Sequence, residues 1–193
     1  MRSTPPVPTR RLRRLEYECL VERGLFEPDD RIELIDGLMV VREPQSAPHL
    51  VAVQLAQRAL ERAFGNGWNV RPAGPVALDD DSEPEPDLAV VPGDPREYVG
   101  GHPARPALVA EVSLTRLVFD REYKSSLYAR AAIVDYWIVN LVDRVLEVRR
   151  RPITSDAAPY GWTYEALTVL GPDASVTPLA APFASILVAD LLP

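Results

Sequence analysis

The sequence predicts an α/β domain (α+β in its order of elements) in which helices flank a central β-sheet. Two apolar runs, at residues 88–91 and 107–112, are continuous rather than alternating, which is typical of strands buried on both faces. Stretches with helical spacing of apolar residues lie before and after them, at 46–64 and 119–132. Elements that alternate in this way along one chain indicate a sheet packed between helices.

The N-terminal region predicts a helix and a β-hairpin. Residues 1–8 are rich in proline and are expected to be disordered, followed by a single domain over 9–193. A first helix is expected from a cap at Thr9 to a stop at Gly24. Its apolar residues have helical spacing: Leu12, Leu15, Cys19 and Leu20. Strands at 32–35 and 38–41 flank Asp36-Gly37, a pair that favours the type I′ turn of a two-residue hairpin.

The remaining elements follow in order. The helix at 46–64 ends at the glycines of 65–67, and short strands are expected at 68–71 and 76–78. A loop rich in proline and glycine, 92–106, separates the two apolar strands, which we expect at the centre of the sheet. After the helix at 119–132 we expect strands at 136–141, 145–149 and 162–169. The tail, 183–192, predicts a closing helical turn or strand.

Composition excludes several classes of protein. The 193 residues carry a net charge of −7, which argues against a protein that coats nucleic acid through bulk electrostatics. Cys19 is the single cysteine and His49 and His102 are the only histidines, so neither an internal disulfide nor a zinc site is expected. The chain shows no signal peptide and no membrane-spanning apolar run, and we expect a soluble, cytoplasmic protein.

Lys124 is the only lysine among 21 basic residues. A chain this rich in arginine retains lysine where a guanidinium would not serve, because an ammonium is compact and its pKa can be tuned. The alternative is a chance survivor on a solvated helix. Lys124 is therefore a candidate reactive group.

Two carboxylates lie at the borders of the apolar strands. Asp87 directly precedes the first strand, and Glu111 lies near the end of the second. If these strands are neighbours, the two carboxylates converge at one end of the sheet. A carboxylate within an apolar strand is costly unless it is paired or metal-bound. Oxygen ligands of this kind suit Mg²⁺, which would activate a water and offset charge on a phosphate.

Lys124 shares a helical face with Asp120 and Tyr128, which lie four residues before and after it. Its ammonium could lean toward the carboxylates, to orient or deprotonate an attacking water and to stabilise charge on phosphate. We expect Asp120 to hold the Lys124 side chain, although an exposed ion pair fits the same spacing.

Other polar residues carry two interpretations each. Glu33, on the first hairpin strand, is either a third carboxylate of the site or an acid on the strand surface. His49, at the start of a helix, could approach the same pocket, but a capping or exposed histidine is favoured. Glu85 and the run from Asp79 to Asp81 are expected to form a solvated loop, whereas Tyr136 and Trp137 are expected in the core.

These motifs together resemble the bacterial Uma-two family of restriction endonucleases. They occur in order over residues 33–142: Glu33-Leu-Ile-Asp-Gly, Pro86-Asp87-Leu-Ala-Val-Val, Glu111-Val-Ser, Asp120-x-x-x-Lys124 with Tyr128-Ala-Arg, and Asp135-Tyr-Trp-Ile-Val-Asn. The resemblance implies a PD-(D/E)XK nuclease with a restriction-endonuclease-like fold and a central mixed β-sheet. It also implies Mg²⁺, which Mn²⁺ can replace, on Asp87 and Glu111, with Lys124 as the catalytic lysine.

The chain departs from the superfamily pattern after Glu111. Ser113 stands where the lysine usually lies, and the resemblance moves that lysine to the following helix. Leu114 and Arg116 replace the small polar residues expected next, so the loop at 113–118 is expected to shape the pocket differently from the family pattern.

Three functions remain open from the sequence. The first is a metal-dependent endonuclease that hydrolyses DNA, with a homodimer expected because cleavage of both strands requires two copies. The second is a nuclease-fold module, weakly active or inactive, that binds nucleic acid or a protein. The third is hydrolysis of a smaller phosphate ester at the same site.

Overall fold

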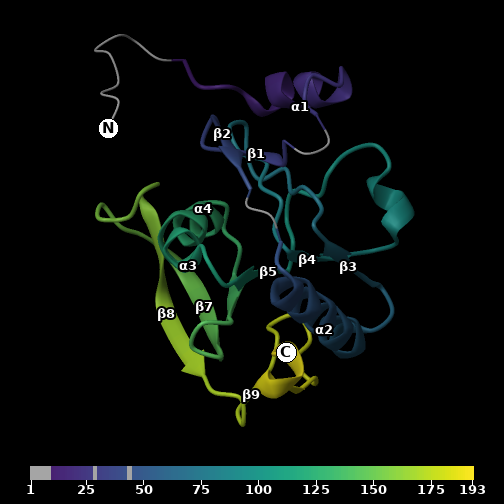
Figure 1. Ribbon diagram of the computed structural model, residues 1–193, viewed down its shortest axis with the longest axis vertical. Helices are drawn as coiled ribbons and strands as arrows, with labels where there is room; N and C mark the ends of the chain where they lie inside the picture. Colours follow the sequence, from purple (N-terminus) through teal and green to yellow (C-terminus); the bar gives the residue numbers. More distant parts are fainter. Residues whose placement is uncertain (1–9, 28–29, 43–44) are drawn as a thin grey trace.

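A computed structural model describes residues 10–27, 30–42 and 45–193 (Figure 1). The expected disorder of residues 1–8 and the expected cap at Thr9 lie outside these ranges. Within them, no helix is both long enough and apolar enough to cross a membrane.

A six-stranded mixed sheet forms the centre of the molecule. Its strands run in the order β3 (Trp68–Pro72), β4 (Leu88–Pro92), β5 (Leu108–Ser113), β6 (Asp135–Asn140), β7 (Val145–Thr154) and β8 (Trp162–Leu170). Neighbouring strands are antiparallel except β5 and β6, which are parallel. A parallel pair needs a crossover connection, and the helical segment between β5 and β6 provides it.

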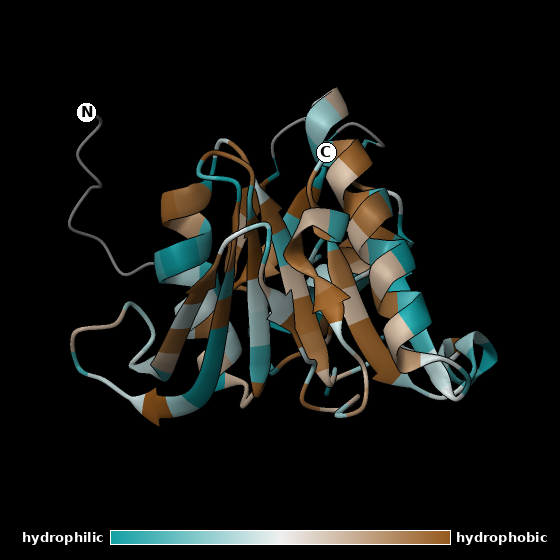
Figure 2. Cartoon of the chain, turned by 90° about the horizontal axis from the view of Figure 1, so that it is seen from below, coloured by the Kyte–Doolittle hydropathy of each residue, from teal (hydrophilic) through white to brown (hydrophobic). Residues whose placement is uncertain are grey.

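Helical elements cover both faces of this sheet (Figures 1 and 2). On one face, α2 (Ala47–Phe64) packs with the C-terminal elements β9 (Ser175–Val176), β10 (Ile186–Leu187) and η3 (Val188–Leu191) over an apolar core. On the other face lies a continuous helical segment made of α3 (Leu117–Phe119), a π turn η2 (Asp120–Lys124) and α4 (Ser125–Arg130). A smaller core beneath it contains Tyr128 and Tyr136. Burial on both faces explains why the central strands are continuously apolar.

The N-terminal hairpin forms a separate two-stranded sheet at the edge of the second face. β1 (Ile32–Ile35) and β2 (Leu38–Val41) pair in the expected register, and Asp36 and Gly37 have φ of 48° and 75°, as a type I′ turn requires. Backbone hydrogen bonds between Leu34 and Glu83 fasten β1 to the domain, at 2.8 and 3.3 Å. The hairpin is therefore anchored at its inner strand.

Most of the expected elements are present, although α1 begins at Arg14 rather than directly after Thr9, and β7 runs to Thr154 rather than to residue 149. Two further expectations were wrong. Residues 76–78 form no strand. Their backbone N–H groups donate to the carbonyl oxygens of Pro84, Pro103 and Ser82 instead of to a neighbouring strand. The first helix, α1 (Arg14–Glu22), packs through Tyr17 rather than through the expected apolar residues, and Leu15 is 67% exposed. Single apolar residues on a short helix do not define which face is buried.

The tail and the segment after β5 refine two other expectations. The tail contains both of the structures expected for it, the short strand β10 and the helical turn η3. The helix expected at 119–132 is present, but it begins at Leu117 and contains the π turn η2. Nothing in the apolar pattern distinguishes a π turn from α-helix.

We predict that Gly37→Ala destabilises the fold through the hairpin turn. A Cβ at Gly37 would overlap the Cβ of Arg11, and the φ of 75° adds strain for any L-residue. Chemical unfolding should show a loss of about 2–3 kcal/mol, or roughly 4–10 °C in Tm. Gly161→Ala is the matched control, because φ is 76° there and an added Cβ would meet no other atom. Its loss of unfolding free energy should be about 1 kcal/mol. Equal losses in the two variants would contradict the close contact at Gly37.

Candidate active site

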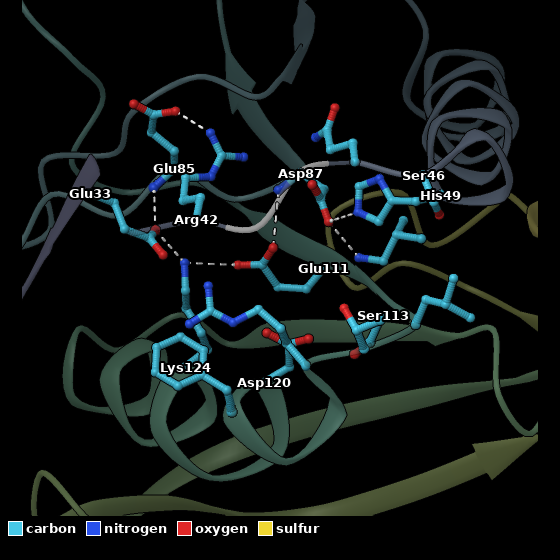
Figure 3. Close-up of a pocket in the computed structure, with 16 residues that line it drawn as sticks. Glu33, Arg42, Ser46, His49, Glu85, Asp87, Glu111, Ser113, Asp120 and Lys124 are labelled. Carbon is cyan, nitrogen blue, oxygen red and sulfur yellow. Dashed lines mark hydrogen bonds and ion pairs between the residues drawn. The ribbon is translucent and has the colours of Figure 1, made fainter. Parts of the chain in front are cut away.

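One cavity of about 390 Å³ gathers the candidate residues from five parts of the chain (Figure 3). It lies between the hairpin, the start of α2, the segment just before β4, the end of β5 and the helical segment 117–130. All of the sequence-predicted site residues line it: Glu33, His49, Asp87, Glu111, Ser113, Asp120 and Lys124. Residues 91 positions apart in the sequence thus meet at one point.

Strand register brings Asp87 and Glu111 together. β4 and β5 are antiparallel with Leu88 opposite Ala110, so the next position places Asp87 opposite Glu111. The backbone N–H of Asp87 donates to Glu111 Oε2 at 3.1 Å, and the N–H of Val112 donates to Asp87 Oδ2 at 2.8 Å. Side chains alternate along a strand, so the apolar neighbours Leu88 and Ala110 face α2 while both carboxylates face the cavity.

Lys124 joins the hairpin to the sheet through two buried ion pairs. Its Nζ lies 2.6 Å from Glu33 Oε2 and 3.3 Å from Glu111 Oε1, and the Lys124 side chain is only 4% exposed. Burial lowers the pKa of Lys124, but the charges of Glu111 and Glu33 outweigh burial and raise the pKa overall. Lys124 is therefore a cation at neutral pH and not a free base.

The role expected for Asp120 as the partner of Lys124 was wrong. The ion pairs of Lys124 run to Glu33 and Glu111, not to the residue four positions earlier. The π turn changes the i,i+4 geometry, and Asp120 lies between Lys124 and Ser113 (Figure 3). Burial raises the pKa of Asp120 to about 6, an effect that Ser113 and Lys124 partly oppose.

Glu111 is the most constrained carboxylate of the site. It accepts a 2.7 Å hydrogen bond from the Tyr128 hydroxyl in addition to its contacts with Asp87 and Lys124. Burial, together with the charges of Asp87 and Asp120, raises the pKa of Glu111 to about 7, against the opposing effect of Lys124. Burial and like charge thus both work against full ionisation of this cluster, and added positive charge would relieve both.

The structure decides between the two interpretations of His49 and of Glu33. His49 Nε2 lies 3.0 Å from Asp87 Oδ2, so the favoured expectation of a capping or exposed histidine was wrong. Burial lowers the pKa of His49, but the hydrogen bond and charge of Asp87 outweigh burial and raise it. Glu33 is buried, with 1% of its surface exposed, and is not a surface acid.

Sequence reasoning missed three charged residues that line the cavity: Arg42, Glu85 and Arg116. Glu85 pairs with Arg42, so the expectation of a solvated loop was wrong for Glu85. Glu83 is also buried. One signal was available for Glu85, because it lies two residues before Asp87 and an extended chain turns alternate residues to the same side. The partners of Arg42 and Arg116 depend on the hairpin docking and left no local signal.

Comparison with known proteins agrees with this site and fold. Residues 14–184 match the Uma2 family model, described as "Putative restriction endonuclease". The chain belongs to the Uma2 family. A solved structure, the "putative nuclease belonging to DUF820" from Anabaena variabilis ATCC 29413, has the same fold with a TM-score of 0.62 and 15% sequence identity. The match covers 88% of this chain and 94% of that one. No protein with a curated description matches.

The family and the fold together support a restriction-endonuclease-like nuclease, with the mixed sheet that the sequence resemblance implied. The departures after Glu111 do not disrupt the cavity of this Uma2 chain. Ser113 is buried in its wall, and Lys124 approaches Glu111 from the helical segment instead of from the strand. A lysine relocated along the sequence thus lies in direct contact with the glutamate.

The donor atoms of this Uma2 site fit a hard divalent cation. Asp87 and Glu111 offer carboxylate oxygens at one end of the sheet, and Asp87 uses Oδ2 for its bonds to His49 and Val112. Among the described residues, no three His, Cys, Asp or Glu side chains are placed to enclose a metal ion. An ion here would take its other ligands from water and substrate, which is the mode of binding that Mg²⁺ prefers.

We predict that Asp120→Asn stabilises the fold near neutral pH. Because burial raises the pKa of Asp120 from 3.8 to about 6, the folded state binds this proton more tightly than the unfolded state does. The protonated Asp120 side chain therefore contributes stability at low pH, and this contribution is lost as pH rises through about 6. Asp120→Asn should raise the free energy of unfolding by about 1–3 kcal/mol at pH 7.5, and by much less at pH near 4.

Urea unfolding in EDTA at the two pH values measures this difference. Asp156→Asn is the control, because Asp156 is an exposed acid in the loop between β7 and β8. A variant that is less stable than the wild type at both pH values would show that the Asp120 carboxylate is well compensated where it lies.

Proposed function

We propose that this Uma2 chain is a divalent-metal-dependent endonuclease that hydrolyses phosphodiester bonds of DNA. One observation carries the proposal: Asp87, Glu111 and the Lys124 ammonium line a single open cavity, with Lys124 in contact with Glu111. Two carboxylates beside a fixed cation suit the hydrolysis of a phosphate diester, which needs a metal site and a positive group near the attacked phosphate. The family description supports DNA as the substrate.

Asp87 and Glu111 would hold Mg²⁺, for which Mn²⁺ can substitute. Bound there, the ion would supply a water of lowered pKa and would offset negative charge on the phosphate. Lys124 would direct its ammonium at the attacking oxygen or at the charge that develops on phosphate. Since the charges of Glu111 and Glu33 raise its pKa, Lys124 would act as a cation and would not accept the proton of the attacking water.

Glu33 and His49 would hold these groups in position. Glu33 accepts from Lys124 Nζ at 2.6 Å and from the backbone N–H of Glu85 at 3.0 Å, which limits the positions that the ammonium can take. His49 contacts the Asp87 oxygen that also accepts from Val112, and so orients that carboxylate. Positioning of this kind reduces the reorganisation needed during reaction. Cleavage of both strands of a duplex would require two copies of the chain.

We predict that cleavage depends on a divalent ion and on both carboxylates. Nicking of supercoiled plasmid should occur with Mg²⁺ or Mn²⁺ and stop in EDTA. Asp87→Asn and Glu111→Gln, which keep side-chain size, should each lower the rate by roughly 10²-fold or more, because each removes a charged metal ligand. Glu165→Gln on β8, where Glu165 pairs with exposed Arg151, is the control and should cleave like the wild type.

Three results would count against the proposal. Wild-type rates in both carboxylate variants would place the chemistry elsewhere. DNA binding without nicking in either metal would favour the module that binds without cleavage. Turnover of a small phosphate diester with no action on plasmid would favour the smaller substrate.

We predict that Lys124→Arg is nearly as damaging to cleavage as Lys124→Ala. The ammonium occupies a buried position between two carboxylates, and a planar guanidinium cannot place a single nitrogen at the same point. Lys124→Ala should also lower stability by about 3–5 kcal/mol, because Glu33 and Glu111 lose their cation. Plasmid nicking and thermal unfolding on the same samples separate the two effects. A wild-type rate in Lys124→Arg would show that only the charge matters.

A further inference from the structure

Four basic side chains line the cavity, and three of them already contact carboxylates. Lys124 pairs with Glu33 and Glu111, Arg42 pairs with Glu85, and His49 contacts Asp87. Arg116 is the fourth. Within the ranges that the structure describes, no hydrogen bond or ion pair joins its guanidinium to a carboxylate.

Arg116 is held in place by neutral groups. Its Nη1 donates to the carbonyl oxygen of Val41 at 3.2 Å, and its guanidinium carbon lies 4.3 Å from the centre of the Phe119 ring. The first contact fixes it to the hairpin and the second to the helical segment, so the side chain spans the edge of the cavity between two elements of the site. These contacts orient the guanidinium without a direct ion pair, although its charge also acts at longer range on Asp120.

We infer that Arg116 binds a backbone phosphate of the substrate at the cavity; this inference rests on the proposed function and names the group that receives the substrate's charge. A guanidinium has five N–H donors, and the bond to Val41 uses one of them, so a pair remains for the two free oxygens of a phosphodiester. A side chain already held in one orientation loses little entropy when it binds.

The charge of the whole chain makes such a group necessary. With a net charge of −7 the protein repels a polyanion at long range, so the substrate must meet local positive charge at the point of contact. Carboxylates neutralise the other cavity cations, and neutralised groups attract phosphate weakly. Arg116 is also one of the residues that replace the small polar residues expected after Glu111, so the altered loop supplies a cation to the cavity.

Direct binding measurements test this inference. Fluorescence anisotropy with a short labelled DNA duplex, in EDTA so that no cleavage occurs, gives the dissociation constant over a series of salt concentrations. Arg116→Gln removes the charge and keeps an N–H donor for Val41. We expect it to bind roughly tenfold more weakly, as loss of a charge-assisted hydrogen bond predicts, with a salt slope shallower by about 1. Arg116→Lys should recover part of the affinity.

Arg71→Gln is the matched control. Arg71 is half-buried on β3, its guanidinium carbon lies 5.5 Å from the centre of the Tyr98 ring, and it has no ion pair to a carboxylate among the described residues. The Arg71→Gln variant therefore loses the same charge and a similar ring contact as Arg116→Gln, but outside the cavity that contains the candidate site. Its affinity for DNA should remain at the wild-type value. Thermal unfolding of both variants checks that the fold is kept.

Four results would overturn the inference. Wild-type affinity in Arg116→Gln would exclude the phosphate contact, and equal weakening in Arg71→Gln would assign the effect to overall charge. Absence of DNA binding by the wild type would exclude it as well. Thymidine monophosphate bound as tightly as duplex, with the same dependence on Arg116, would assign the contact to small phosphate esters. Binding through Arg116 without cleavage in Mg²⁺ or Mn²⁺ would contradict the proposed function alone.

Discussion

The buried ion pairs of Lys124 are the constraint on which the arrangement of the site depends. An ammonium removed from water is stable only when carboxylates surround it, and the two that do so come from the hairpin and from the centre of the sheet. The helix that carries Lys124, strand β1 and strand β5 must therefore meet at one point. The contacts of Glu83 with Leu34 and of Arg116 with Val41 fasten the hairpin where this requirement places it.

The period of two along a β-strand separates the core from the site. On β4 and β5 the residues that face α2 are apolar, and the alternate positions contribute Asp87, Glu111 and Ser113 to the cavity. A shift of one residue in the pairing of these strands would exchange the two sets and bury the carboxylates against α2. The apolar packing that stabilises the domain thus also fixes the separation of the acidic groups.

Local features of the sequence were enough to predict most of the fold and the members of the site. Asp36-Gly37 determines its turn through backbone angles alone, and the continuous apolar runs identify β4 and β5 as buried strands. The contacts that each site residue makes were harder to predict, because they depend on how distant segments of the chain pack together. The pairing of Lys124 with Glu33, the contact of His49 with Asp87 and the burial of Glu83 all required the position of the hairpin and of α2. Regular helical spacing also gave Asp120 the wrong partner, since a π turn leaves no mark on the apolar pattern.

The π turn has a consequence for how this site can change during evolution. Such a turn holds one more residue than the α-helical turn it replaces, and the hydroxyl of Tyr136 bonds to the Asp120 carbonyl within it at 3.0 Å. Deletion of one residue there would restore α-helix and rotate α3, on the N-terminal side of the turn, by about 100° relative to Lys124. Asp120 and the loop that bears Arg116 would move away from the cavity, while Lys124 would keep its ion pairs with Glu33 and Glu111. A single codon loss could therefore reshape the entrance of the pocket and leave its interior intact.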